Sequence, residues 1–286
     1  MKIAYRQFQP SAPVAPYVQY FWTLGDEGEL PEGGYFIHKC LPLGTAEIVF
    51  HLTDQPKSFK QADKWVELPD AYLVGVWTEK ATVKIPRGAL SFGISIHPDA
   101  LTRIFGTPIG ELWNDCLDGR LVFGKGFGAL TARIREAADD RERVRIAEAW
   151  LLGCLNRQAA QSDYVSEAAR RLRHSGGTLS VDALSSEVFI GRRQLERSFK
   201  EFIGVSPKMF GRLARFSRAY SLVDHNPNAS WAAISFDCGY ADQAHFIRDF
   251  KAFTGEAPRA FFTDEACLAT LPRLAALQES LASCKS

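Results

Sequence analysis

Residues 195–207, LERSFKEFIGVSP, and residues 246–258, FIRDFKAFTGEAP, are two copies of one thirteen-residue stretch. At an offset of 51 residues, six of the thirteen positions are identical, among them an arginine, a glycine and a proline. In each copy the apolar residues recur at the spacing of one helix face, and the glycine and the proline end the helix. A repeat of this kind indicates one supersecondary unit that the chain builds twice.

Short helical segments surround both copies and predict an all-helical region. The predicted helices span 164–174, 181–188, 192–203, 206–224, 231–238, 243–254 and 258–262. N-cap residues precede four of them: Ser180, Gly191 (the weakest of the four), Ser230 and Asp242. The pattern predicts two helix-turn-helix units joined by one long helix. The first unit has Phe189 where the second has the turn glycine Gly239, so the two turns need not be the same.

The second helix of each unit displays side chains that suit the reading of DNA bases. An α-helix fits the major groove of B-DNA, where arginine pairs with guanine and glutamine with adenine. The joining helix has 19 residues from Ser206 to Asp224, which is about 28 Å. Because one duplex turn is about 34 Å, a single chain is expected to enter two successive segments of the major groove.

The charge distribution agrees with this interpretation without proving it. Net charge is +1, yet residues 164–262 carry 14 Lys and Arg against 10 Asp and Glu, while residues 1–163 carry 18 against 20. Such a count is equally typical of a solvated helical surface. The repeat is what favours DNA binding.

The segments LERSFKEFIGVSP with the following RLARFSRAYSLV, and CGYADQAHFIRDFKAFTGEAPRAFF, resemble the DNA-binding domain of the AraC/XylS family of bacterial transcription regulators. The resemblance covers about 100 residues and implies binding to double-stranded promoter DNA, activation as the usual outcome, and RNA polymerase as a partner. Carried over position by position, it assigns DNA contacts to Arg192, Arg193, Glu196, Arg197 and Lys200 in the first unit, and to Gln243, Ala244, His245, Arg248 and Lys251 in the second.

The expected roles differ within this set. Lys200 and Lys251 are better suited to phosphates than to bases, and Arg212 is a further candidate for a phosphate contact. Glu196 could accept a hydrogen bond from cytosine, or it could pair with Arg192 on its own helix face. Both alternatives stay open.

Residues 1–160 are predicted to form a sensor domain, 161–263 the DNA-binding domain, and 264–286 a helical tail. Between residues 35 and 97 the chain has short β-branched and aromatic runs separated by Gly, Pro and Asp, which are typical of an antiparallel sheet closed as a small barrel or a sandwich. The stretches KCLPLGTAEIVFHL, YLVGVW and FGISIHPDALTRIFGTPIGEL are similar to a sensor-like domain of some family members, which implies a cupin-like fold. The predicted class is an α+β two-domain protein.

What the N-terminal domain binds stays open between a small-molecule effector and a protein partner. An aromatic-rich barrel could hold an apolar or aromatic effector, or it could be a filled core. Residues 141–158 place apolar side chains on one helical stripe, for which packing inside the chain is favoured over contact with a second copy in a homodimer.

An enzyme is the main alternative class. His38, His51 and His97 could hold a metal in a cupin-like barrel, but no HxH pair occurs and Glu47 has no partner at ligand spacing. No nucleotide-binding or hydrolase motif occurs. We therefore predict no catalytic residue, no metal and no cofactor.

Composition indicates where the protein works. The six cysteines are scattered without metal spacing and are expected to be free thiols of a reducing compartment. No apolar run approaches the roughly 18 residues of a membrane span, and the start of the chain lacks a signal-peptide core. The expected location is the cytoplasm, with no membrane partner.

Overall fold

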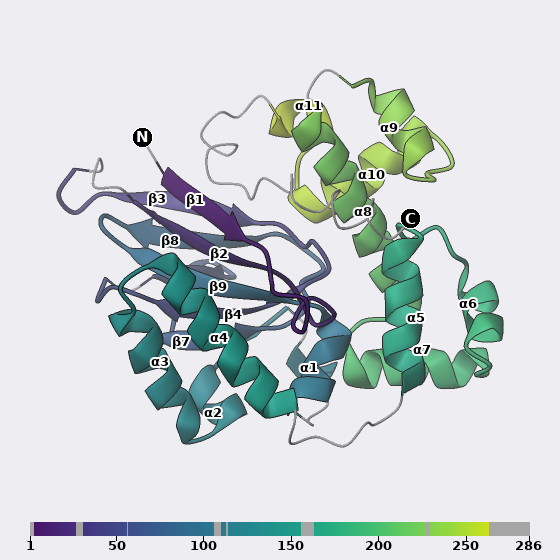
Figure 1. Ribbon diagram of the computed structural model, residues 1–286. Coiled ribbons are helices and arrows are strands. Elements are labelled where there is room, and N and C mark those ends of the chain that lie inside the picture. Colours follow the sequence, from purple (N-terminus) through teal and green to yellow (C-terminus); the bar gives the residue numbers. More distant parts are fainter. Residues whose placement is uncertain are drawn as a thin grey trace.

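The computed structural model describes residues 3–26, 31–55, 57–105, 110–112, 114–155, 163–226 and 229–262. A β-rich N-terminal part and a helical C-terminal part lie against each other (Figure 1). The predicted tail, 264–286, and the predicted domain boundary at residue 160 lie outside the described residues, so both stay predictions. None of the described helices is long and apolar enough to cross a membrane.

The N-terminal part contains two antiparallel sheets. Their strands are β1 (Ile3–Phe8), β2 (Val18–Asp26), β3 (Tyr35–Cys40), β4 (Ala46–His51), β5 (Ser58–Gln61), β6 (Lys64–Glu67), β7 (Ala71–Val74), β8 (Ala81–Pro86), β9 (Leu90–Ile96) and β10 (Cys116–Asp118). One sheet has the order β1-β2-β9-β4-β7-β10 and the other β3-β8-β5-β6. No strand pairing joins the two sheets within the described ranges, so the expected barrel is an open, two-layer sandwich. A closed barrel would need hydrogen bonds along both edges.

Helices cover the outer face of the six-stranded sheet. They are α3 (Gly126–Glu136) and α4 (Asp140–Leu155), beside the shorter α1 (Pro98–Phe105), η1 (Gly110–Leu112) and α2 (Gly119–Phe123). Strand β4 shows why a layer forms on each face, because its side chains alternate. Ile48 and Phe50 join the core under the helices, whereas Glu47 and Val49 face the four-stranded sheet. The apolar stripe of α4 packs inside the chain, as predicted.

The C-terminal part is helical throughout its described length. Its helices are α5 (Asp163–His174), α6 (Val181–Glu187), α7 (Arg192–Phe202), α8 (Pro207–His225), α9 (Trp231–Asp237), α10 (Gln243–Thr254) and α11 (Pro258–Phe261). All seven were predicted to within two residues at each end. The side chains of Ser180, Ser206, Ser230 and Asp242 each accept a backbone N–H of the helix that follows, which fixes where these helices begin.

The turns of the two helix-turn-helix units start with the same backbone step. Phe189 has a φ of 55° and Gly239 a φ of 70°. After each of them the next N–H donates to an equivalent carbonyl, from Ile190 to Ser185 (3.1 Å) and from Tyr240 to Ser235 (2.9 Å). The sequence difference therefore does not change the turn. It places a phenylalanine in a left-handed conformation that glycine adopts without strain.

The two parts share one hydrophobic core. Tyr20, Leu43 and Val76 from the sandwich are buried together with the helices of the C-terminal part. Lys39 Nζ lies 3.0 Å from a carboxylate oxygen of Glu256. Gly110 of η1 approaches the end of α7 so closely that a Cβ there would lie 2.2 Å from the Lys200 carbonyl oxygen. The N-terminal part therefore contacts the second helix of the first unit directly, through η1.

Candidate nucleic-acid interface and internal cavity

The ten residues predicted to contact DNA lie on α7 and α10. Eight of them are exposed, while Glu196 and His245 are partly exposed. The opposite faces of the two helices are buried through residues such as Leu195 and Phe250. This division arises because the apolar positions of each repeat recur every three to four residues. Both helices thus present a polar face to solvent.

The polar face of α7 carries its own hydrogen bonds. Arg192 Nε donates to Glu196 Oε1 at 3.1 Å and its Nη1 to Asp182 Oδ1 at 3.0 Å. Of the two alternatives for Glu196, the structure shows the pair with Arg192. Arg197 Nη2 donates to Gln194 Oε1 at 2.6 Å. These exposed contacts orient the guanidinium groups. Breaking them would cost little free energy, because surface ion pairs contribute less than about 1 kcal/mol.

The polar face of α10 is less charged. Asp242 caps the helix through the N–H of His245, at 2.6 Å. The His245 ring meets the Tyr240 ring edge-on, with centroids 5.2 Å apart. His245 is therefore partly engaged in packing, whereas Arg248 and Lys251 are exposed.

Arg212 has a different partner from the one its sequence position indicated. Its Nη2 lies 2.7 Å from Asp249 Oδ1, and its guanidinium carbon lies 5.1 Å from the centre of the Phe253 ring. The Asp249 side chain is 8% exposed, so this ion pair is largely buried. Arg212 therefore joins α8 to α10, and its candidate role as a phosphate contact stays a prediction.

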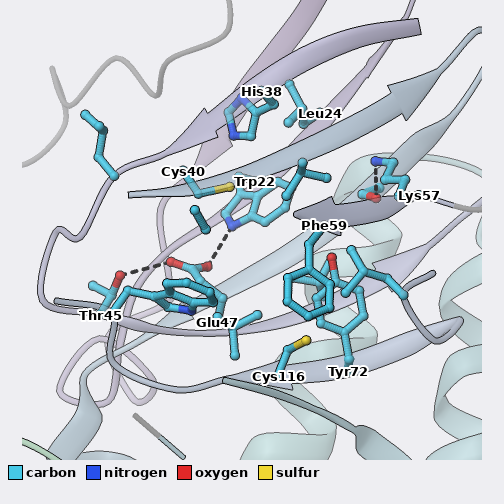
Figure 2. A pocket seen from close by; sticks show the side chains of 18 of the residues that line it. Trp22, Leu24, His38, Cys40, Thr45, Glu47, Lys57, Phe59, Tyr72 and Cys116 are labelled. Atoms are coloured by element: carbon cyan, nitrogen blue, oxygen red, sulfur yellow. Dashed lines mark hydrogen bonds between the residues drawn. The ribbon is translucent and has the colours of Figure 1, made fainter. Parts of the chain in front are cut away.

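A second candidate site lies inside the sandwich. A cavity of about 150 Å³ opens between the two sheets. Its labelled lining in Figure 2 is Trp22, Leu24, His38, Cys40, Thr45, Glu47, Lys57, Phe59, Tyr72 and Cys116. One water needs about 10–15 Å³ of such a volume. The cavity could therefore hold roughly ten waters or a small organic molecule.

Glu47 is the acidic group of this cavity. Trp22 Nε1 donates to its Oε2 at 2.8 Å, and Thr45 Oγ1 to its Oε1 at 3.0 Å. Burial raises the pKa of Glu47 from 4.5 to about 7. Trp22 reaches it because β9 carries Gly93 opposite, where a Cβ would lie 2.0 Å from the indole. Among the residues that the structure describes, no cation lies within ion-pair distance of Glu47.

Lys57 is the basic group of the cavity. Its Nζ donates to Ser91 Oγ at 2.5 Å, and the residue is 3% exposed. Burial lowers the pKa of Lys57 from 10.5 to about 7. No carboxylate of the described chain lies within ion-pair distance. The sequence contains no signal for the burial of Lys57, because a lysine beside a strand is almost always exposed.

The cavity is also lined by two cysteines, Cys40 and Cys116, and by one histidine, His38. Burial raises the pKa of Cys40 to about 12 and that of Cys116 to about 11, so both stay protonated thiols. Cys40, Cys116 and Cys238 are free thiols. His38 lines the cavity and His97 does not. No three His, Cys, Asp or Glu residues are grouped as metal ligands anywhere in the described ranges.

One wall of the cavity is also part of the core shared with the helices. Leu41, Leu43 and Thr45 line the cavity, and Leu43 belongs to the core that α8 completes. The adjacent Gly44 lies against Leu213 of α8, whose Cβ would be 3.4 Å from a Cβ added to the glycine. A shift of the cavity-lining segment would therefore act directly on α8, the helix that joins the two units.

Known protein families match the two parts separately. The model of a helix-turn-helix domain matches residues 184–264. A domain of unknown function (DUF6597) matches residues 6–118. The cavity between the sheets is thus in the uncharacterised part, and α7 and α10 are in the helix-turn-helix part.

Curated relatives are regulators of transcription. The chain is 30% identical over 130 residues to the HTH-type transcriptional regulator ArgR of Pseudomonas aeruginosa, covering 46% of this chain and 37% of ArgR. It is 30% identical over 86 residues to the HTH-type transcriptional activator RhaS of Escherichia fergusonii, covering 30% of this chain and 31% of RhaS. The chain thus spans about a third of either protein. The Msm operon regulatory protein of Streptococcus mutans is 29% identical over 229 residues, 74% of each chain.

Among solved structures, ToxT from Vibrio cholerae aligns over 92% of this chain and 98% of its own, with 11% identity and a TM-score of 0.49.

Proposed function

The chain belongs to the AraC family of helix-turn-helix regulators, and we propose that it controls transcription by reading two successive major-groove segments of promoter DNA with α7 and α10. One observation carries this proposal. Arg197 and Arg248 occupy equivalent positions of the repeat, and both are exposed on helices whose other faces are buried. Arginine is the side chain that most often reads guanine in the major groove.

The spacing of the two helices supports the proposal. Helix α8 has 19 residues, about 28 Å at 1.5 Å per residue. The buried pair of Arg212 and Asp249 ties this helix to α10. A rigid connection of nearly one duplex turn suits two reading helices that enter the groove on one side of the DNA.

Individual roles follow from position and charge. Arg192, Arg193 and Arg197 are assigned to bases or nearby phosphates in the first unit, with Glu196 orienting Arg192. Gln243, Ala244, His245 and Arg248 are assigned to the second unit. Lys200 and Lys251, at the far ends of the two helices, are assigned to phosphates. Because α10 offers fewer charged groups, we expect the second unit to read fewer bases.

The sandwich is proposed to regulate this activity. Its cavity is lined by aromatic and apolar groups around a few polar ones, the composition of small-molecule sites. Contacts through Leu43 and Gly110 connect it with α8 and α7. Binding of an effector there is proposed to change how the first unit lies relative to the second. A homodimer and contact with RNA polymerase stay predictions.

Selection of bound duplexes from a random library, with the full chain at stated salt, tests the DNA-binding proposal. We expect a bipartite motif whose halves are about one helical turn apart. Arg197→Ala and Arg248→Ala should each cost about 1–3 kcal/mol on the selected site and relax base preference in one half only. Lys251→Ala should weaken all sequences alike.

Lys60→Ala, which removes an exposed lysine on β5 remote from the helices, is the matched control and should leave the motif unchanged. If Arg197→Ala and Arg248→Ala both keep full discrimination, α7 and α10 are not the reading helices.

A further inference from the structure

The cavity contains one acidic and one basic side chain that the protein does not pair with each other. Glu47 has hydrogen bonds from Trp22 and Thr45, and Lys57 has one to Ser91. Neither has a counter-ion among the described residues. In the view of Figure 2, Glu47 and Lys57 are drawn apart, and each makes its hydrogen bonds with different residues. A desolvated charge without a partner is unfavourable, so this arrangement lowers the stability of the folded chain.

A ligand that carries a single charge would satisfy only one end. An organic cation could pair with Glu47 and lie against the aromatic rings, but Lys57 would remain unpaired and would repel it. An organic anion could pair with Lys57, but Glu47 would repel it. A neutral apolar molecule would displace any water around both groups and leave each charge less solvated.

A ligand with both charges would satisfy both ends. An ammonium or amidinium group donates to the carboxylate, and a carboxylate accepts from the lysine, each as a charge-assisted hydrogen bond. The indole of Trp77 adds a donor, because its Nε1 is buried and has no partner in the described chain, and the residue lines the cavity. A carboxylate or carbonyl oxygen of the ligand would pair with it.

We propose, building on the function above, that the effector is an amphoteric organic molecule whose cationic group pairs with Glu47 and whose anionic group pairs with Lys57 across the cavity between the two sheets. Its body is apolar or aromatic, because most residues that line the cavity contribute rings or aliphatic chains. Its size is that of a small metabolite, since the cavity measures about 150 Å³.

Of the two charged groups, Glu47 is the one that links the cavity to the helices. Thr45 donates to Glu47, and the segment just before Thr45 contacts α8 through Gly44 and Leu43. A cation on Glu47 competes for the carboxylate oxygen that now accepts from Thr45. Occupation of the cavity is therefore coupled to the position of the segment that touches the joining helix.

The test uses three probes with one common ring. 4-(Aminomethyl)benzoate carries both charges, 4-methylbenzylamine only the cation and 4-methylbenzoate only the anion; 6-aminohexanoate is a flexible amphoteric probe. Binding to the full chain is measured by calorimetry and by tryptophan fluorescence, since Trp22 and Trp77 line the cavity. We expect at least one amphoteric probe to bind about tenfold or more tightly than either single-charge probe, the effect of one extra charge-assisted hydrogen bond.

Variants identify each end separately. Glu47→Gln should remove the advantage of the amphoteric probe over 4-methylbenzoate, and Lys57→Met its advantage over 4-methylbenzylamine. Glu67→Gln and Lys60→Met change an exposed glutamate and an exposed lysine of the neighbouring strands, and both should bind like the unmodified chain.

Three outcomes would overturn the assignment: an amphoteric probe that binds no better than the single-charge probes, affinities unchanged in both cavity variants, or no binding of any probe by a chain that still selects DNA. In that last case the DNA-reading function stands and the assignment of the cavity falls. Probe binding by a chain that selects no DNA, with or without the bound probe, would leave the cavity assignment intact and remove the DNA-reading function.

Discussion

Two buried sets of ionisable groups lie in the two halves of this chain, and they are built in opposite ways. In the C-terminal half, Arg212 and Asp249 form an ion pair at 2.7 Å within a closely packed aromatic core. In the N-terminal half, Glu47 and Lys57 line an open cavity without counter-ions in the described chain. Burial alone does not explain the difference, because Asp249 and Lys57 are both buried, whereas Glu47 is partly exposed.

The comparison distinguishes a structural site from a binding site. The paired charges of the C-terminal half hold α8 against α10, and the pair has no charge left to offer a ligand. The unpaired charges of the N-terminal half weaken the fold, and strained or unsatisfied groups persist mainly where function requires them. Replacing charges in the two halves should therefore change stability in opposite directions.

Lys57→Met should have the largest effect, and it should stabilise the protein. The folded-state pKa of Lys57 is about 7 and its ordinary value is 10.5, so the folded chain binds its proton more weakly than the unfolded chain. The penalty is fully present below about pH 7 and disappears as pH rises toward 10.5. At pH 6 we expect a gain of about 4 kcal/mol, after allowing about 1 kcal/mol for the lost hydrogen bond to Ser91.

Urea denaturation at pH 6 and at pH 10 measures this effect, with Lys60→Met as the exposed control. A gain that is equal at both pH values would mean that Lys57 is not held in its charged form against burial.

Arg212→Ala should destabilise the protein by about 3 kcal/mol, because it leaves the Asp249 carboxylate buried without its cation. Removing one partner of a buried ion pair costs about 3–5 kcal/mol. We expect the lower value here, because the Arg212 side chain is 31% exposed. Denaturation of the isolated variant is compared with Lys208→Ala, an exposed lysine on the same helix. If both variants lose the same small amount of stability, the ion pair does not fix the position of α10.

Glu47→Gln should stabilise the protein by about 2 kcal/mol at pH 8 and have little effect at pH 4. The pKa of Glu47 is raised from 4.5 to about 7 in the folded state, so the folded chain keeps the proton that the unfolded chain releases. The penalty is absent below pH 4.5, grows as pH rises and is complete above about pH 7. A melting temperature that rises equally at pH 4 and pH 8 would contradict this.

Sequence patterns predicted the C-terminal half better than the N-terminal half, and the reason is physical. Helix ends and reading faces depend on residues a few positions apart, so the capping residues and the repeat were sufficient to place α5 to α11. The pair of Arg212 and Asp249 joins residues 37 positions apart. No local sequence pattern marks this pair, so the sequence predicts Arg212 only as a candidate phosphate contact.

The cavity could be predicted only in part. Alternating apolar residues indicated a sheet with a buried face, and Glu47 was noticed only as an acidic residue without a partner. The presence of two separate sheets depends on which strands pair, which the strand sequences do not specify. The burial of Lys57 follows from that pairing, because it places the residue before β5 under the opposite sheet.

The smallest effect is expected within the DNA-binding half, where the two turns differ by one side chain. Phe189 holds a φ of 55° and its side chain extends into solvent, with 92% of the residue exposed. Relief of the left-handed conformation is worth about 1–2 kcal/mol, and the added freedom of glycine in the unfolded chain costs about 0.5–1 kcal/mol. Phe189→Gly should therefore stabilise the first unit by up to about 1 kcal/mol. Gly239→Ala is the inverse variant and should destabilise the second unit, both through its φ of 70° and because a Cβ would lie 2.5 Å from Thr178.

Thermal unfolding and DNA selection on both variants decide whether the strain at Phe189 has a use. If Phe189→Gly is more stable and binds DNA as tightly as the unmodified chain, the strain at Phe189 has no role in binding. It is then tolerated only because it is small. If it gains stability and loses affinity, the exposed ring takes part in binding, and the first turn joins Glu47 and Lys57 as a place where the fold is weakened for function. A loss of stability would show that the left-handed conformation is not strained here, and the comparison between the two turns would fail.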